Sequence, residues 1–139
     1  MAQPTMSRPL HPADVLYAGS RPFPVLPACE HYAGSEKLLG KALQLQAELA
    51  AEGIFFDVTG DCEDGAPAGR EREHAEMIAR IAAGPENLCG RLGARIHDVR
   101  HPAWRDELEV LIHGAGQQLA YVVLPKPERA DDALTQITL

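Results

Sequence analysis

The amino-acid sequence predicts an α/β protein built on a parallel β-sheet of about four strands. Short runs of apolar and β-branched residues alternate along the chain with longer stretches in which apolar residues recur at helical spacing. A parallel crossover needs a connection of roughly a dozen residues, usually a helix, so this alternation favours βα units. Polar residues also follow several of the apolar runs directly. Because parallel sheets bind ligands at the carboxyl ends of their strands, we expect functional residues there.

The length and charge of the chain narrow its function classes. Its 139 residues, 45% of them hydrophobic, fit one domain. The net charge of −7, from 20 acidic and 13 basic residues, has the wrong sign for binding nucleic-acid phosphates. No apolar run approaches the ~20 residues of a membrane span, and residues 1–24 lack the apolar block of a signal peptide. We therefore expect a cytoplasmic protein that binds neither nucleic acid nor membrane.

The N-terminal part is expected to comprise a proline-rich arm, residues 1–24, before a folded domain, residues 25–139. Residues 24–27 are a short apolar segment in the position of a first strand. A helix is predicted to begin at Ser35 and to end at Gly53. The apolar positions that recur at helical spacing in this segment are Leu38, Leu39, Ala42, Leu43, Leu45 and Leu49.

The remaining elements follow the same alternation. Residues 54–58 form a compact β-branched and aromatic run, typical of a strand buried on both faces, and lead into an acidic loop, residues 59–69. The next helix is predicted over residues 70–83, where a Gly-Pro pair stops it. The rest of the predicted order is a strand over 92–97, a helix over 102–113, a strand over 119–124 and a helix begun within 130–139.

Three carboxylates, Asp61, Glu63 and Asp64, fall within four residues after the second apolar run. Such crowding raises carboxyl pKa values unless a cation or hydrogen bonds compensate. One interpretation is that Glu63 and Asp64 help to hold a divalent metal such as Mg²⁺, directly or through water, because that ion prefers oxygen ligands. The other interpretation is a solvated acidic loop that caps the next helix.

Two basic residues are predicted at the same edge of the sheet. Arg95 lies inside the third predicted strand, where burying an arginine is costly unless it meets an anion. That anion is either a substrate carboxylate or an acidic residue of the neighbouring strand end, Glu63 or Asp64. Lys126 follows the fourth strand and points at the same rim, although a lysine in this position is more often solvated surface.

The cysteines and histidines give weaker signals. Cys29, Cys62 and Cys89 are odd in number and widely spaced, so a disulfide framework or a metal knuckle is not expected. His97 and His101 are four residues apart, but Pro102 and the preceding apolar run place them at a strand end and loop rather than on a helix. We therefore expect neither group to be a metal site.

Four short motifs, in order along the chain, carry a resemblance to a known family. They are residues 27–42, which include Ser-Glu-Lys-Leu at 35–38; Asp-Cys-Glu-Asp-Gly-Ala at 61–66; Gly-Ala-Arg-Ile at 93–96; and Val-Leu-Pro-Lys-Pro-Glu at 123–128. Their order and spacing resemble the citrate lyase β-subunit-like branch of the HpcH/HpaI aldolase superfamily. Asp64, in place of the histidine that is typical of the aldolase branch, favours the lyase branch.

The resemblance implies the first half of a (β/α)8 TIM barrel over residues 25–139 and Mg²⁺-dependent retro-aldol or retro-Claisen cleavage of a carboxylic acid or its CoA thioester. It implies catalytic roles for Arg95, Glu63 and Asp64, substrate binding by Arg95 and Lys126, and metal contacts by Glu63 and Asp64. The family's main metal ligands come from fifth and sixth strands, for which this sequence has no counterpart. An isolated half is therefore expected to be inactive.

A half-barrel exposes two sheet edges, so a partner is expected, either a second copy in a homo-oligomer or a complementing second barrel half. The alternative function is a non-catalytic binding or scaffold module made of such half-barrels. A third interpretation is a small flavodoxin-like domain, although the fifth βα unit of that fold is missing.

Overall fold

The computed structural model describes residues 29–138, which form a four-stranded parallel sheet with helices between its strands. The predicted arm, residues 1–24, and the predicted first strand, residues 24–27, lie outside the described residues. The strands are β1 (Glu30–Ala33), β2 (Asp57–Asp61), β3 (Leu92–Arg95) and β4 (Val122–Val123). The helices are α2 (Glu36–Ala50), α3 (Glu71–Ala83), α4 (Trp104–Ala115) and α5 (Ala130–Ile137).

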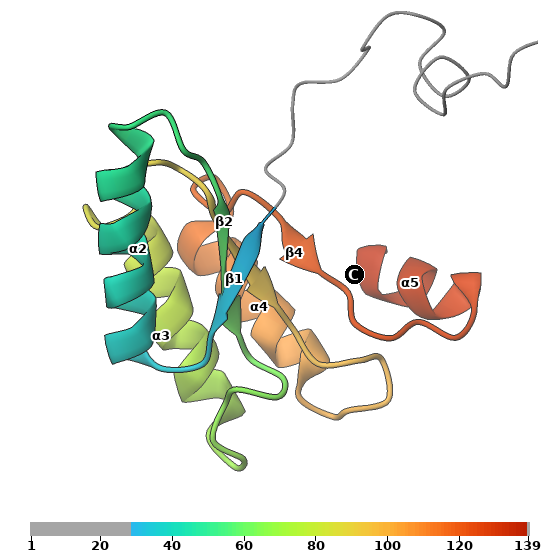
Figure 1. The fold of residues 1–139 in the computed structure, drawn as a ribbon. Helices are drawn as coiled ribbons and strands as arrows, with labels where there is room; N and C mark the ends of the chain where they lie inside the picture. Colours follow the sequence, from blue (N-terminus) through green and yellow to red (C-terminus); the bar gives the residue numbers. More distant parts are fainter. Residues whose placement is uncertain (1–28, 139) are drawn as a thin grey trace, which may run out of the picture.

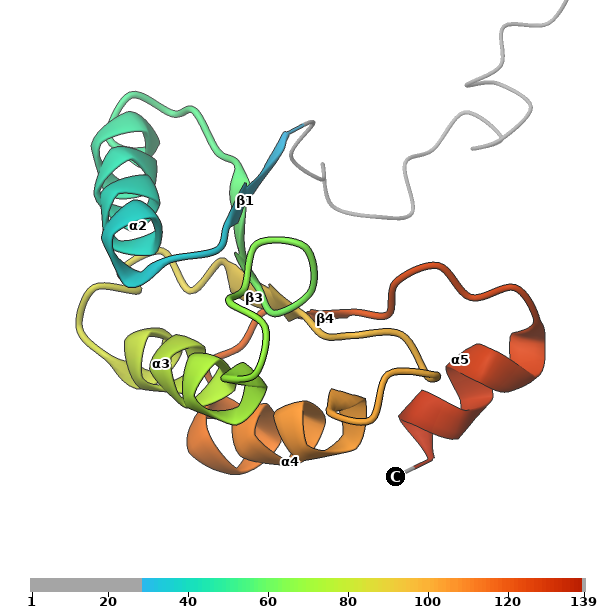
Figure 2. The ribbon, with the colours of Figure 1, turned by 90° about the horizontal axis from the view of Figure 1, so that it is seen from below.

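The strands lie in the sheet in the order in which they occur in the sequence, β1-β2-β3-β4. Figure 1 shows α2 and α5 at the two sides of the molecule. Figure 2 views the sheet from the end where the strands finish and shows α2, α3 and α4 together on one side of it. In a doubly wound sheet, the first strand lies in the interior, later strands are added on both sides of it, and helices cover both faces. The flavodoxin-like interpretation is therefore wrong, and the predicted partial (β/α)8 barrel of four βα units is confirmed.

The hydrophobic core lies between the sheet and the helices. Alternate strand residues face outward toward the helices, as Gly60 shows, because a Cβ at this position would lie 2.8 Å from the Ile78 side chain of α3. The large apolar residues with under 2% exposure are Leu39, Leu43, Val58, Ile78, Leu92, Ile96 and Leu111. These residues lie on helices α2, α3 and α4 and on strands β2 and β3, except for Ile96, which directly follows β3. One cluster therefore joins three βα units.

The opposite, inner face of the sheet is polar. Thr59 in β2 donates a hydrogen bond to Glu30 of β1 and lies 2.8 Å from the Tyr121 hydroxyl, which also donates to the Val58 carbonyl. The Tyr121 ring covers Gly93 so closely that a Cβ there would lie 2.2 Å from it. Burial raises the pKa of Tyr121 well above its usual value, so the phenol stays protonated.

Two strands lie farther along the chain than predicted. The first is β1, a four-residue edge strand with three exposed positions, whose polar residues hide it from a search for apolar runs. The second is β2, which starts at Asp57, whereas residues 54–58 were expected; Ile54 and Phe55 are about half exposed. The expectation was wrong because only one face of β2 packs against helices, so its inner face carries polar residues.

The helices match the predictions more closely. The Ser35 hydroxyl accepts a hydrogen bond from the Leu38 amide and caps α2, while Arg70 and Gly84 bound α3. Leu38 and Leu45 were expected on the buried face of α2 but are 56% and 47% exposed.

The later strands are shorter than predicted: β3 ends at Arg95 rather than at residue 97, and β4 has two residues of the predicted 119–124. No helix among residues 29–138 is long and apolar enough to cross a membrane.

Candidate functional site

The carboxyl ends of β2 and β3 bring the predicted site residues together. The two strands are parallel neighbours, and their register places Asp61, the last residue of β2, directly opposite Arg95, the last residue of β3. Both belong to the inner-facing set of the sheet. The acidic loop continues from Asp61, and Lys126 lies beyond the end of β4. Parallel pairing in register therefore gathers residues from three separate motifs at one rim.

Arg95 and Asp61 form a two-pronged ion pair at this rim. The Arg95 Nε donates to Asp61 Oδ1 at 2.9 Å and Nη2 donates to Oδ2 at 2.8 Å. The side chains are 17% and 6% exposed, so solvent screens the pair weakly. The hydrogen bonds that Arg95 donates to Asp61 raise the already high pKa of Arg95. Burial acts to raise the pKa of Asp61, but hydrogen bonds from Arg95 and from the Glu63 and Gly65 amides outweigh it and hold that pKa below its usual value.

Glu63 and Asp64 complete a charged cluster around Arg95. Arg95 Nη1 lies 2.9 Å from Glu63 Oε2, and Nη2 donates to Asp64 Oδ2 at 3.2 Å. Lys126 Nζ lies 2.9 Å from Glu63 Oε1 and 3.7 Å from Asp64 Oδ1. The ion pair with Glu63 raises the pKa of Lys126. Although Glu63 is only 8% exposed, its Oε2 makes no hydrogen bond, because the approach of Arg95 has poor hydrogen-bond geometry.

Two contacts with the β1 end hold this cluster in place. The Tyr32 ring lies beneath the Arg95 guanidinium, 4.8 Å from ring centroid to Cζ, a cation–π arrangement. The loop after β1 also touches the acidic loop through backbone atoms: a Cβ on Gly34 would lie 2.1 Å from the Gly65 carbonyl oxygen. Glycine is therefore needed where these two loops meet.

The structure gathers every predicted site residue, and it adds two that the sequence analysis did not assign. Arg95, Glu63, Asp64 and Lys126 lie in one cluster, in which the predicted ion pairs of Arg95 with Glu63 and Asp64 are present. The principal partner of Arg95, however, is Asp61. The sequence signal for Asp61 was its place at the head of the acidic motif, whereas its register with Arg95 is set by the fold. The Tyr32 contact gave no signal, because the apolar pattern put the first strand at residues 24–27, before β1.

The carboxylates at this rim do not by themselves fit a magnesium site. Both Asp61 oxygens already accept hydrogen bonds from Arg95 and from backbone amides, and Glu63 and Asp64 face two basic side chains. Within residues 29–138 no group of three or more His, Cys, Asp or Glu side chains is arranged to hold a metal ion. A divalent cation would need oxygen ligands from outside these residues.

A second polar cluster lies beyond the end of β3. His97 Nδ1 lies 2.6 Å from Oε1 of the fully buried Glu107 of α4, whose Oε2 accepts from the His97 amide. The His101 ring stacks on His97 with 3.8 Å between centroids. The His101 Nδ1 accepts from the Ala103 amide. These rings thus tie the β3–α4 loop to α4.

The cysteines take no part in either cluster. Cys62 is buried, and burial raises the pKa of its thiol well above the usual value, so it stays protonated. Cys29 and Cys89 are free thiols in the structure as well.

Comparison with known proteins finds a similar solved structure. No protein-family model and no curated protein matches the chain. Among solved structures, the chain is similar to a citrate lyase from Burkholderia xenovorans LB400, with a TM-score of 0.75 and 47% sequence identity. The match covers 82% of this chain and 35% of that protein, so the present chain spans about a third of the length of its neighbour.

Proposed function

Because the chain belongs to the citrate lyase-like family, as a partial member, we propose that it supplies the carboxylate-binding part of a carbon–carbon lyase site. The observation that carries this proposal is the arrangement of Arg95. Asp61 fixes one edge of the guanidinium, Nε and Nη2, at the rim of the sheet. The Nη1 atom faces Glu63 Oε2 without a hydrogen bond of good geometry, so it retains donors for a ligand.

A substrate carboxylate suits Nη1, since guanidinium groups form strong charge-assisted hydrogen bonds with carboxylates. Nη2 already donates to Asp61 and Asp64, so Nη1 is the nitrogen that would bind the substrate. We propose a carboxylic acid, or its CoA thioester, as the substrate class. Retro-aldol or retro-Claisen cleavage of such a compound breaks the carbon–carbon bond next to a carbonyl and leaves negative charge on an enolate oxygen. A fixed positive charge at that oxygen lowers the barrier, and Asp61 acts as a positioning residue because it holds Arg95 in one orientation.

Charge balance supports a divalent cation as part of this proposal. Asp61, Glu63 and Asp64 against Arg95 and Lys126 leave a formal charge of −1 in the cluster. An anionic substrate adds further negative charge, and Mg²⁺ would offset it. Its oxygen ligands would have to come from outside the described residues, while Glu63 and Lys126 orient groups at the rim.

A second candidate function is a non-catalytic binding or scaffold module. The observation that favours it is the pairing of Arg95 and Lys126 with neighbouring carboxylates, as in a purely structural ion-pair network. In this case the rim would stabilise the loops without binding an acid.

Calorimetric titration of the whole chain with oxaloacetate, with and without Mg²⁺, separates the two functions. The control is Arg91, which pairs with Asp57 at the opposite end of the same two strands. We expect Arg95→Gln to weaken binding by about 10- to 100-fold, the effect of losing charge-assisted hydrogen bonds, and Arg91→Gln to leave affinity unchanged. Absence of binding by the folded wild-type chain, or equal loss in both variants, would overturn the lyase-type site and favour the scaffold.

A further inference from the structure

We propose that two copies of this chain associate edge to edge and close an eight-stranded barrel, with β4 of each copy beside β1 of the other. This pairing rests on the shape of the sheet and on its two ends. It does not depend on the proposed activity, because it is argued from the sheet edges and their flanking helices and not from the charged cluster around Arg95.

The topology makes such closure geometrically consistent. Among the described residues β1 pairs only with β2, and β4 only with β3, so each end of the sheet has a free edge. A two-fold axis along the barrel gives the strand order β1-β2-β3-β4 twice, with every neighbouring pair parallel. Both seams then have the same composition, as a symmetric dimer requires. Eight parallel strands are the number that closes a barrel of this type.

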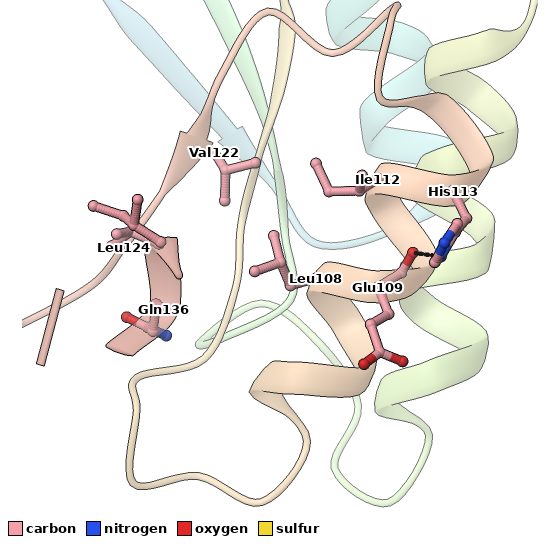
Figure 3. A pocket seen from close by; sticks show the side chains of 8 residues that line it. Leu108, Glu109, Ile112, His113, Val122, Leu124 and Gln136 are labelled. Atoms are coloured by element: carbon pink, nitrogen blue, oxygen red, sulfur yellow. Dashed lines mark hydrogen bonds between the residues drawn. The ribbon is translucent and has the colours of Figure 1, made fainter. Parts of the chain in front are cut away.

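Exposed apolar side chains gather at both ends of the sheet. At the β1 end, Leu38 and Leu45 of α2 border a cavity of about 430 Å³. At the β4 end, Ile137 of α5 borders a cavity of about 440 Å³, and Leu134 lies exposed on the same helix. Figure 3 shows Leu108 and Ile112 of α4, with Val122 and Leu124, around this second cavity.

These two surfaces meet in the proposed dimer. In a (β/α)8 barrel each helix packs beside the next, so α5 of one copy and α2 of the other flank the same seam. Exposed apolar patches of this kind mark association sites. The arrangement also explains why Leu38 and Leu45, which continue the apolar stripe of α2, are not covered within one copy.

The charges on the two helices are complementary. Lys37 and Lys41 are exposed near the start of α2, and neither forms an ion pair within residues 29–138. Asp131 and Asp132 lie in the first turn of α5, and within residues 29–138 the one ion pair of Asp131 is with Arg129 at 4.0 Å. Helix α2 follows β1 and α5 follows β4, and all strands are parallel. The first turns of both helices would therefore lie near the same end of the barrel. The lysines of one copy then face the aspartates of the other.

Light scattering after gel filtration, with sedimentation equilibrium, tests the proposal on the full chain. We expect a species of twice the 15.1 kDa chain mass. Leu134→Glu combined with Ile137→Glu should give a folded monomer, because both side chains are exposed within one copy. The matched control is Leu88→Glu, which changes a 77% exposed leucine in the α3–β3 loop, away from both edges, and should leave the dimer intact.

A series of charge reversals tests the same interface in case the variant that combines Leu134→Glu with Ile137→Glu does not fold. Lys41→Glu and Asp131→Lys should each raise the dimer dissociation constant by about 3- to 10-fold, since each change affects both seams. The combined variant should recover most of the wild-type affinity. A folded wild-type monomer, a mass other than that of two chains, or a dimer that the α5 substitutions do not weaken would overturn the proposal.

Discussion

At the residue scale, Asp61 and Arg95 connect the fold to the candidate chemistry. Their pairing follows directly from the parallel register of β2 and β3, which places both at strand ends on the inner face. Asp61 accepts hydrogen bonds from Arg95 and also from the Glu63 and Gly65 amides, so it holds both the guanidinium and the acidic loop. One carboxylate thus sets the geometry of two candidate site residues, Arg95 and Glu63.

We predict that Asp61→Asn lowers the free energy of unfolding by about 2 kcal/mol at pH 7, because a nearly buried charged partner of Arg95 is lost. The ionised Asp61 has a lowered pKa in the folded protein. Its contribution is therefore present above the unfolded pKa of about 3.9 and is lost as the pH falls through the folded value. Urea unfolding between pH 7 and pH 2 should show a smaller acid-dependent loss in the variant than in the wild type.

The control for this prediction is Asp57→Asn, which breaks the more exposed pair with Arg91. A loss of stability smaller than that of Asp61→Asn is expected there. Identical acid dependence in the wild type and in Asp61→Asn would show that the rim pair contributes no linked stability.

At the element scale, the loops at the carboxyl ends of the strands are positioned by direct backbone contact. The loop between β1 and α2 touches the acidic loop between β2 and α3 where Gly34 meets Gly65. The acidic loop is thus held from one side by β1 and from the other by Arg95 of β3. The location of Glu63 and Asp64 therefore depends on a contact between two βα units, and not on the acidic motif alone.

Gly34→Ala is expected to lower stability by roughly 1–3 kcal/mol, because its Cβ would lie 2.1 Å from the Gly65 carbonyl oxygen and neither backbone can yield locally. The opposite sign is expected for Gly40→Ala, within α2, where a Cβ meets no atom within 4 Å and alanine favours the helix by about 1 kcal/mol. Thermal unfolding by circular dichroism measures both. Equal effects of the two substitutions would mean that the loop contact is not tight.

At the scale of the whole molecule, one hydrophobic cluster joins the outer face of the sheet to three helices, while the inner face holds a polar network. This division is typical of a barrel segment, in which the helices provide the apolar layer and the strands enclose the functional groups. It also leaves the sheet with two free edges among the described residues, which is the basis for the proposed pairing of two copies.

The core prediction concerns Leu39, which is fully buried on α2. Leu39→Ala should cost about 2–5 kcal/mol of stability, because it removes buried methyl groups and leaves a cavity. Leu88→Ala, at a 77% exposed position, should change stability by less than about 0.5 kcal/mol. Chemical unfolding at one protein concentration compares them, and a small loss at Leu39 would contradict a single cooperative core.

The sequence by itself determined the order of βα units and the helix boundaries near Ser35, Arg70 and Gly84. It also named the candidate residues Arg95, Glu63, Asp64 and Lys126, which lie in one cluster in the structure. These features follow from local periodicity, caps and short motifs, which act over a few residues. The tertiary structure decided the rest. It located β1 and β2, whose inner faces are polar and therefore lack apolar periodicity, and it set the strand order that excludes a doubly wound sheet. It also made Asp61 the principal partner of Arg95, because only the register between two strands brings residues 34 positions apart into contact.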